Sequence, residues 1–147
     1  MRICVLMGPS NVGKTETIQK IAKYFSNNKK ASCIFCNKDK NSKNDMICVY
    51  EYNNQLIGII SFGDYEDGIK EAYNEIIARV KSVDYLICVS RTKENTIKYI
   101  KTLSSSIIKI KKSYLDTNDG RIICNYKDQL NEDLARFIYD NLFNMFD

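Results

Sequence analysis

The sequence predicts an α/β domain, with a mainly parallel β-sheet covered by helices on both faces and an antiparallel hairpin strand at one edge. Two observations lead to this fold class. Short apolar runs typical of buried strands alternate along the chain with amphipathic stretches of helical period. Two β-rich runs near the middle are separated by only two asparagines, which is typical of a hairpin. At 147 residues the chain has the usual length of one domain with its own core, so residues 1–147 are expected to fold as one unit.

The first strand and the first helix are expected on either side of a glycine-containing loop. Residues 2–7 (RICVLM) form a short apolar run that fits a buried parallel strand. After the loop, apolar side chains recur at the spacing of one helix face: Ile18, Ile21, Ala22 and Phe25. This pattern ends at Asn27 and Asn28, residues that tolerate the left-handed conformation common at helix ends.

The hairpin is predicted from residues 46–52 and 55–62. The two asparagines between these runs accept the positive φ that a type I′ turn needs. The second run (QLIGIISF) is nearly all apolar and is therefore expected in the centre of the sheet. Ahead of the hairpin, residues 32–36 (SCIFC) are predicted as a strand and residues 37–45 (NKDKNSKND) as a solvated loop.

The second half of the chain continues the alternation of helices and strands. Residues 66–81 have the cleanest amphipathic pattern in the sequence and predict a helix. The elements expected after it are a strand at 84–90, a helix at 94–103, two short strands at 107–110 and 121–125, and a final helix at about 128–145. Because the carboxyl ends of parallel strands share one edge of a sheet, the residues that follow these strands are expected to meet at one rim.

The loop after the first strand contains a complete G-x-x-x-x-G-K-[ST] pattern in residues 8–15 (GPSNVGKT). A strand is predicted before it and a helix after it, as this motif requires. On these residues the sequence resembles the P-loop NTPase superfamily. The specific resemblance covers residues 2–28, about one fifth of the chain, and is architectural beyond them. It implies a three-layer P-loop NTPase fold that binds a nucleoside triphosphate, ATP or another, together with Mg²⁺.

The resemblance also implies a role for each residue of the loop. Backbone N–H groups that point into the loop bind the phosphates, and the helix dipole assists them. Lys14 reaches the β- and γ-phosphates, and the hydroxyl of Thr15 is a ligand of Mg²⁺. The implied nucleotide-binding residues are Gly8, Pro9, Ser10, Asn11, Val12, Gly13, Lys14 and Thr15.

Two further residues are candidates for the chemistry. A second metal ligand is expected at the end of an apolar strand, and Asp64 ends a run that resembles a Walker B strand. The alternative for Asp64 is a turn residue or a cap of the next helix. Arg91 follows another predicted strand, where a guanidinium would stabilise charge on a transferring phosphoryl group; an ordinary exposed arginine is the alternative. The candidates are thus Lys14, Asp64 and Arg91 for catalysis, and Thr15 and Asp64 for the metal.

Three classes of nucleotide-binding protein fit these residues. The first hydrolyses the γ-phosphate of ATP or transfers it to a small-molecule acceptor, as small P-loop kinases do. The second is a switch resembling small GTPases and the third is a non-catalytic binding module, and both act through a protein partner. Guanine specificity requires N-K-x-D after a late strand, whereas residues 37–40 (NKDK) come early and end in lysine, which favours ATP. Motor-type hydrolases place Asp-Glu at the strand end, and Asp64-Tyr65 departs from that pattern.

Composition narrows the choice of partners. A net charge of +4 and a pI near 8.7 fall short of those of a dedicated nucleic-acid binder, so nucleic acid is not expected as a partner. Lys109, Lys111 and Lys112 form a basic cluster that is expected on a solvated face. No apolar run is long enough to span a bilayer, so no membrane association is expected. The absence of histidine excludes histidine-dependent acid–base catalysis.

The cysteines point to a reducing compartment. Cys33 and Cys36 form a C-x-x-C pair, but the sequence has no second pair of that spacing, which a structural zinc site would need. The other four cysteines lie in apolar runs and are expected to pack as small hydrophobic residues: Cys4, Cys48, Cys88 and Cys124. We therefore expect reduced thiols and a cytoplasmic protein.

Overall fold

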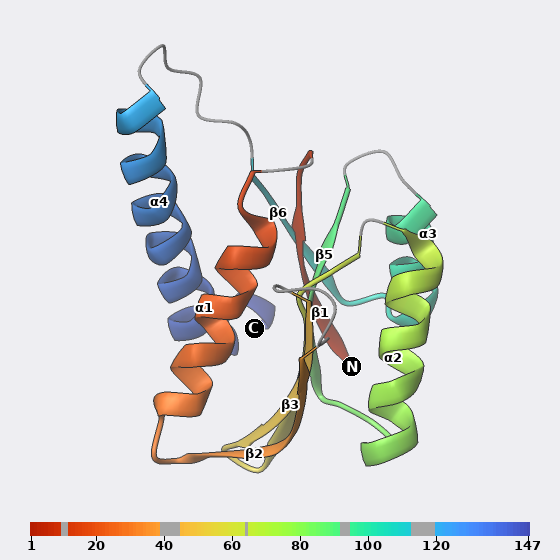
Figure 1. Ribbon diagram of the computed structural model, residues 1–147. Helices are drawn as coiled ribbons and strands as arrows, with labels where there is room; N and C mark the ends of the chain where they lie inside the picture. Colours follow the sequence, from red (N-terminus) through yellow and green to blue (C-terminus); the bar gives the residue numbers. More distant parts are fainter. Residues whose placement is uncertain (10–11, 39–44, 64, 92–94, 113–119) are drawn as a thin grey trace.

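A computed structural model describes residues 1–9, 12–38, 45–63, 65–91, 95–112 and 120–147, with residues 120–126 described by their backbone alone (Figure 1). The elements are β1 (Arg2–Met7), α1 (Lys14–Asn27), β2 (Ala31–Lys38), β3 (Met46–Tyr52), β4 (Gln55–Ile60), α2 (Glu66–Val80), β5 (Tyr85–Ser90), α3 (Asn95–Leu103), β6 (Ile107–Lys111), α4 (Gly120–Asn141) and a 3₁₀ turn (Asn144–Phe146). The strands form one sheet in the order β2-β3-β4-β5-β1-β6. The predicted α/β class is confirmed.

Four strands of the sheet run parallel, namely β4, β5, β1 and β6. Strand β3 is antiparallel to both of its neighbours, β2 and β4. The predicted hairpin joins β3 to β4, and Asn53 and Asn54 have φ angles of 53° and 60°, as a type I′ turn requires. One detail differs from the prediction. The antiparallel strand is not the outermost one, because β2 pairs along its other side and forms the edge of the sheet.

The sheet is the middle of three layers. Helices α1 and α4 cover one face, and α2 and α3 cover the other (Figure 1). Side chains of β1 alternate between these faces, as a strand buried on both sides requires. Cys4 and Leu6 pack toward α1 and α4, whereas Ile3 and Val5 pack toward α2 and α3. Among the helices that the structure describes, none has the length and apolar character needed to cross a bilayer.

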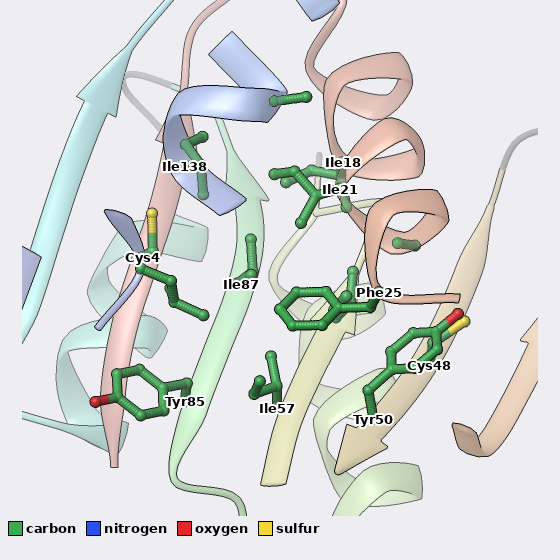
Figure 2. Close-up of a cluster of buried hydrophobic side chains, with 14 of the residues drawn as sticks. Cys4, Ile18, Ile21, Phe25, Cys48, Tyr50, Ile57, Tyr85, Ile87 and Ile138 are labelled. Atoms are coloured by element: carbon green, nitrogen blue, oxygen red, sulfur yellow. The ribbon is translucent and has the colours of Figure 1, made fainter. Parts of the chain in front are cut away.

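An aromatic cluster joins α1 and α4 to the antiparallel part of the sheet. Phe25, on the buried face of α1, stacks on Tyr50 of β3 with 5.7 Å between the ring centroids (Figure 2). The same ring meets Tyr139 of α4 edge-on at 4.8 Å. Each such pair contributes about 0.5–1.5 kcal/mol beyond the burial of apolar area. The contact between α1 and α4 matters for function, because the candidate loop leads into α1.

The end of the chain corrects the predicted strand at 121–125. These residues belong to α4, which begins at Gly120 and continues to Asn141. The apolar trio Ile122-Ile123-Cys124 favours a strand locally, but it is continuous with the amphipathic helix that follows. Extending an existing helix adds one hydrogen bond per residue, so the longer element overrides the local β preference. The prediction of the final helix itself is confirmed, although it ends at Asn141, before a 3₁₀ turn.

The cysteines also differ from the expectation of reduced thiols. Cys36 of β2 lies directly opposite Cys48 of β3 in the antiparallel ladder, and the two form a disulfide. The expectation is therefore wrong for this pair, because strand register brings together residues 12 positions apart. Cys4 and Cys88 are free and buried, and burial raises the pKa of the Cys4 thiol to about 12. Cys33 is free and exposed.

Candidate functional site

The glycine-containing loop leaves β1 between the ends of β5 and β6. The backbone N–H of Gly8 donates to the carbonyl of Ser90 at 3.2 Å, and the N–H of Lys112 donates to the carbonyl of Met7 at 2.7 Å. A β-carbon on Gly8 would lie 2.2 Å from the backbone oxygen of Lys112. Glycine is thus required here, because the overlap would be with backbone that cannot move aside independently.

The other end of the loop is formed by Gly13, which precedes the first residue of α1. Gly13 has φ 86° and ψ 27°, a left-handed conformation that glycine adopts at little cost. Its carbonyl accepts hydrogen bonds from the backbone N–H of Thr17 at 3.1 Å and from the Thr17 hydroxyl at 2.7 Å. Gly13 has no side chain and so makes no side-chain cap hydrogen bond to the first turn of α1. This arrangement suits an anion at the helix N-terminus.

Lys14, which the motif predicts to reach the phosphates, contacts the start of the loop. Its side chain is only 6% exposed, and its Nζ donates to the carbonyls of Gly8 at 2.8 Å and Pro9 at 2.6 Å. An ammonium group this buried would be costly without hydrogen-bond partners, and the loop carbonyls supply them. The ammonium is therefore held at the mouth of the loop, where a bound phosphate would meet it.

Thr15 connects the start of α1 to the end of β4. Its hydroxyl donates to the carbonyl of Ser61 at 3.0 Å, and the Ser61 hydroxyl accepts from the N–H of Met46 at 2.8 Å. Ser61 precedes the candidate metal ligand Asp64 by three positions. Asp64 itself lies outside the described residues, as do Ser10 and Asn11 of the loop. The proposed roles of these three residues remain predictions.

The ends of β4 and β5 meet beside the loop. A β-carbon on Gly63 would lie 2.2 Å from the backbone oxygen of Val89, so the chain leaving β4 presses against β5. Arg91 follows β5, and its Cζ lies 5.8 Å from the ring centroid of Tyr65, the residue after Asp64. The described residues after β1, β4 and β5 therefore converge on one rim, as predicted. The catalytic role of Arg91 is not tested by this geometry.

Three residues behind the loop were not identified from the sequence. Asn131 of α4 is only 6% exposed, and its side-chain amide would be 2.5–2.7 Å from a β-carbon on Gly13. The Nζ of Lys112 donates to Asn131 Oδ1 and, at 3.3 Å, to the hydroxyl of Thr17. Asn131 is in helical phase with the buried residues Ala135, Ile138 and Leu142. The sequence did contain one signal for this contact, namely that Asn131 is a polar residue in the otherwise apolar stripe of this helix.

The position of Lys112 differs from the expectation that the three lysines of its cluster lie on a solvated face. Lys109 and Lys111 are exposed, but Lys112 is partly buried against α1 and α4. Burial lowers the pKa of the Lys112 ammonium, and the negative charge of Glu16 acts in the opposite direction. Only the first two lysines thus belong to a solvated face.

A cavity of about 380 Å³ adjoins the loop on the side of β6 and α4. It shares Val12 with the loop, and its apolar wall includes Leu130 and Leu134. Lys111, Lys112 and Lys127 supply positive charge around it, and Asp133 adds one carboxylate. Its lining thus combines an apolar surface with polar groups, next to the predicted phosphate site.

Comparison with known proteins identifies the family. A family model described as RNA helicase matches residues 4–108, from β1 to β6, which is more than half of the chain. The chain belongs to the RNA helicase family. This family is of the P-loop NTPase type, so the resemblance to that superfamily is confirmed, and the chain binds nucleotide. Neither the curated proteins nor the solved structures gave a match.

Membership of the RNA helicase family bears on two earlier expectations. The Asp64-Tyr65 pair argued against a motor-type hydrolase, and a helicase-type family gives that argument less weight. The expectation that nucleic acid is not a partner receives no support from this family. The segment that matches the RNA helicase family includes the whole loop and the ends of β4 and β5, but it does not include α4.

Proposed function

We propose that this chain is a Mg²⁺-dependent nucleoside triphosphatase with ATP as its preferred substrate. The observation that carries the proposal is the position of the Lys14 ammonium, held 2.6–2.8 Å from two carbonyls of the loop that ends in left-handed Gly13. Left-handed Gly13 and the ammonium of Lys14 beside the described part of the loop are two features that such a loop uses to bind an anion, and both are already in place. The preference for ATP rests on the absence of a guanine-specific N-K-x-D motif.

Each residue of the site has a distinct part in this proposal. Lys14 exchanges its carbonyl partners for β- and γ-phosphate oxygens, and such charge-assisted hydrogen bonds are the stronger ones. The Thr15 hydroxyl lies at the carboxyl end of β4, which suits a metal held jointly with Asp64. When bound, Mg²⁺ neutralises charge on the β- and γ-phosphate oxygens. Arg91, beside Tyr65, adds positive charge on the same rim.

The two sides of the loop differ, and this difference suggests how the bound nucleotide is oriented. Thr15 faces the end of β4, so the metal and the γ-phosphate belong on that side. The nucleoside then extends toward β6 and α4, where the 380 Å³ cavity begins at Val12. An apolar wall with polar groups around it suits a nucleobase, which has apolar faces and a hydrogen-bonding edge.

Leu130→Glu should test this direction. Leu130 is 47% exposed and lines the cavity, so a carboxylate there should weaken ATP binding by roughly 10-fold through lost apolar contact and repulsion of the phosphates. Calorimetry with ATP and with inorganic tripolyphosphate measures the effect, and the loss should be larger for ATP. Phe137→Glu is the matched control, because Phe137 is 53% exposed on the same helix and does not line the cavity. Equal losses for both ligands, or in both variants, would argue against the cavity as the nucleoside site.

Coupling to RNA is the second element of the proposal, and the family match favours it. The net charge of +4 and the exposed lysines at 109 and 111 are compatible with contacts to a phosphate backbone. Phosphoryl transfer to a small molecule and a nucleotide-dependent switch are the competing functions. They differ from an RNA-coupled hydrolase in what stimulates phosphate release.

Asp64→Asn tests the hydrolase directly. We expect Mg²⁺-dependent phosphate release from ATP by the unaltered protein, and a decrease of at least about 100-fold in the variant, because a metal ligand has been removed. Calorimetry should show a larger loss of ATP affinity with Mg²⁺ than without it. Asp67→Asn, an exposed carboxylate in the first turn of α2, serves as the control and should leave turnover unchanged.

The same assay separates the competing functions. Stimulation by single-stranded RNA supports coupling, and turnover only in the presence of a small-molecule acceptor supports a phosphotransferase instead. Binding without any turnover would support a switch or a binding module. Equal effects of Asp64→Asn with and without Mg²⁺ would contradict its assignment as a metal ligand.

A further inference from the structure

Three elements that are distant in sequence meet behind Gly13. Lys112 follows β6, Asn131 lies in the middle of α4, and Thr17 belongs to the first turns of α1. The Lys112 ammonium donates to Asn131 Oδ1 and to the Thr17 hydroxyl, which in turn donates to the carbonyl of Gly13 at 2.7 Å. The chain of polar contacts therefore ends on the backbone of the loop itself.

Asn131 also fills the space that a side chain at position 13 would occupy. Both polar atoms of its amide would lie within 2.7 Å of a β-carbon on Gly13. Such close packing against one face restricts rotation of the Gly13 peptide. Asn131 is buried and Lys112 partly buried, which is costly for polar groups unless their hydrogen bonds are made.

We propose that Lys112 and Asn131 are positioning residues of the phosphate-binding loop: they hold Gly13 in its left-handed conformation and so set the affinity of the loop for phosphate. This inference rests on the proposed function of the loop as a triphosphate site. Glycine populates left- and right-handed conformations about equally when unrestrained, so Gly13 requires an external restraint to remain in one of them. Lys112 and Asn131 supply that restraint from the end of β6 and from α4. They therefore act on phosphate binding through Gly13, in addition to lining the cavity proposed for the nucleoside.

Restraint of Gly13 before an anion binds should have a measurable effect on affinity. A loop that must first be ordered binds an anion more weakly than one already in its bound conformation. Asn131→Ala and Lys112→Met should therefore lower the affinity for both ATP and inorganic tripolyphosphate by on the order of 10-fold. Both residues also line the cavity proposed for the nucleoside, so the loss for tripolyphosphate is the one that reports on the phosphate site itself.

A matched variant distinguishes positioning from general stability. Tyr139→Phe removes the hydrogen bond that Asn28 donates to the Tyr139 hydroxyl at 2.6 Å, which joins the same two helices at their far ends. All three variants should lower the free energy of unfolding in urea, but only Asn131→Ala and Lys112→Met should weaken anion binding. Unchanged tripolyphosphate affinity in both of these variants would overturn the inference and leave the pair a purely structural contact.

A second readout needs no ligand. The amide resonance of Gly13 in the nucleotide-free protein should shift or broaden in Asn131→Ala and Lys112→Met, and should stay in place in Tyr139→Phe. If the unaltered protein bound neither ATP nor tripolyphosphate, the proposed function would fail. The positioning of Gly13 would then be decided by this resonance alone, and an unchanged signal in both variants would refute it.

Discussion

Replacing Lys14 with alanine should lower the affinity for ATP by at least about 100-fold, because a hydrogen bond to a charged group contributes about 1.5–3 kcal/mol and the proposed function gives Lys14 contacts to two phosphates. The ammonium is buried and held by the carbonyls of Gly8 and Pro9, directly over the loop. Among the described side chains, Lys14 is the cation in contact with the interior of the loop.

The measurement is titration calorimetry with ATP and with tripolyphosphate, since both ligands should be affected. Lys14→Met is a second variant, which keeps most of the apolar stem and removes only the charge. Lys20→Met is the control on the same helix, because Lys20 pairs with Asp128 and Glu132 away from the loop. Nucleotide affinity that survives in both Lys14 variants would refute the assignment of the loop as a phosphate site.

Gly8→Ala should cause a large loss of stability. The new methyl group would lie 2.2 Å from the backbone oxygen of Lys112, so β1 and β6 would have to separate where the loop begins. Overpacking of this kind costs about 1–3 kcal/mol, and at this position it also disturbs the loop. We expect both a lower free energy of unfolding and weaker tripolyphosphate binding.

Gly68→Ala is the matched comparison for this substitution. In the first turns of α2, the side chain that a β-carbon on Gly68 would meet, among the residues the structure describes, is that of Phe62, at an ordinary 3.8 Å. Alanine should therefore stabilise the protein by about 0.5–1 kcal/mol through its higher helix propensity. Urea unfolding of both variants tests the pair, and a Gly8→Ala protein as stable as the unaltered one would contradict the close approach of β1 and β6.

The elements predicted most accurately are those whose pattern is local. The strand at 2–7, the helix after the loop and the Asn-Asn turn each depend on a few neighbouring residues, and the structure confirms all three. The predicted strand at 121–125 was wrong because the conformation of these residues depends on the helix with which they are continuous. The pairing of Cys36 with Cys48 depends on strand register, which short apolar runs do not define.

The candidate site was predictable to a similar degree. The loop motif predicted Lys14, Gly13 and Thr15 as site residues, because the motif specifies residue types at fixed spacing, and their roles stay predictions. Asn131 and Lys112 have no such spacing, since their contact with the loop arises from the packing of α4 against α1. A single sequence does not specify which of its distant segments contact each other in the folded protein.

The position of α4 affects how this chain can be shortened. The segment that matches the family ends at residue 108, the second residue of β6. A fragment cut there would lack the Lys112 backbone that borders Gly8 and the Asn131 amide that packs against Gly13. It would also expose the hydrophobic face of α1 that α4 covers. The smallest fragment expected to retain a formed phosphate-binding loop is therefore longer than the segment by which its family is recognised.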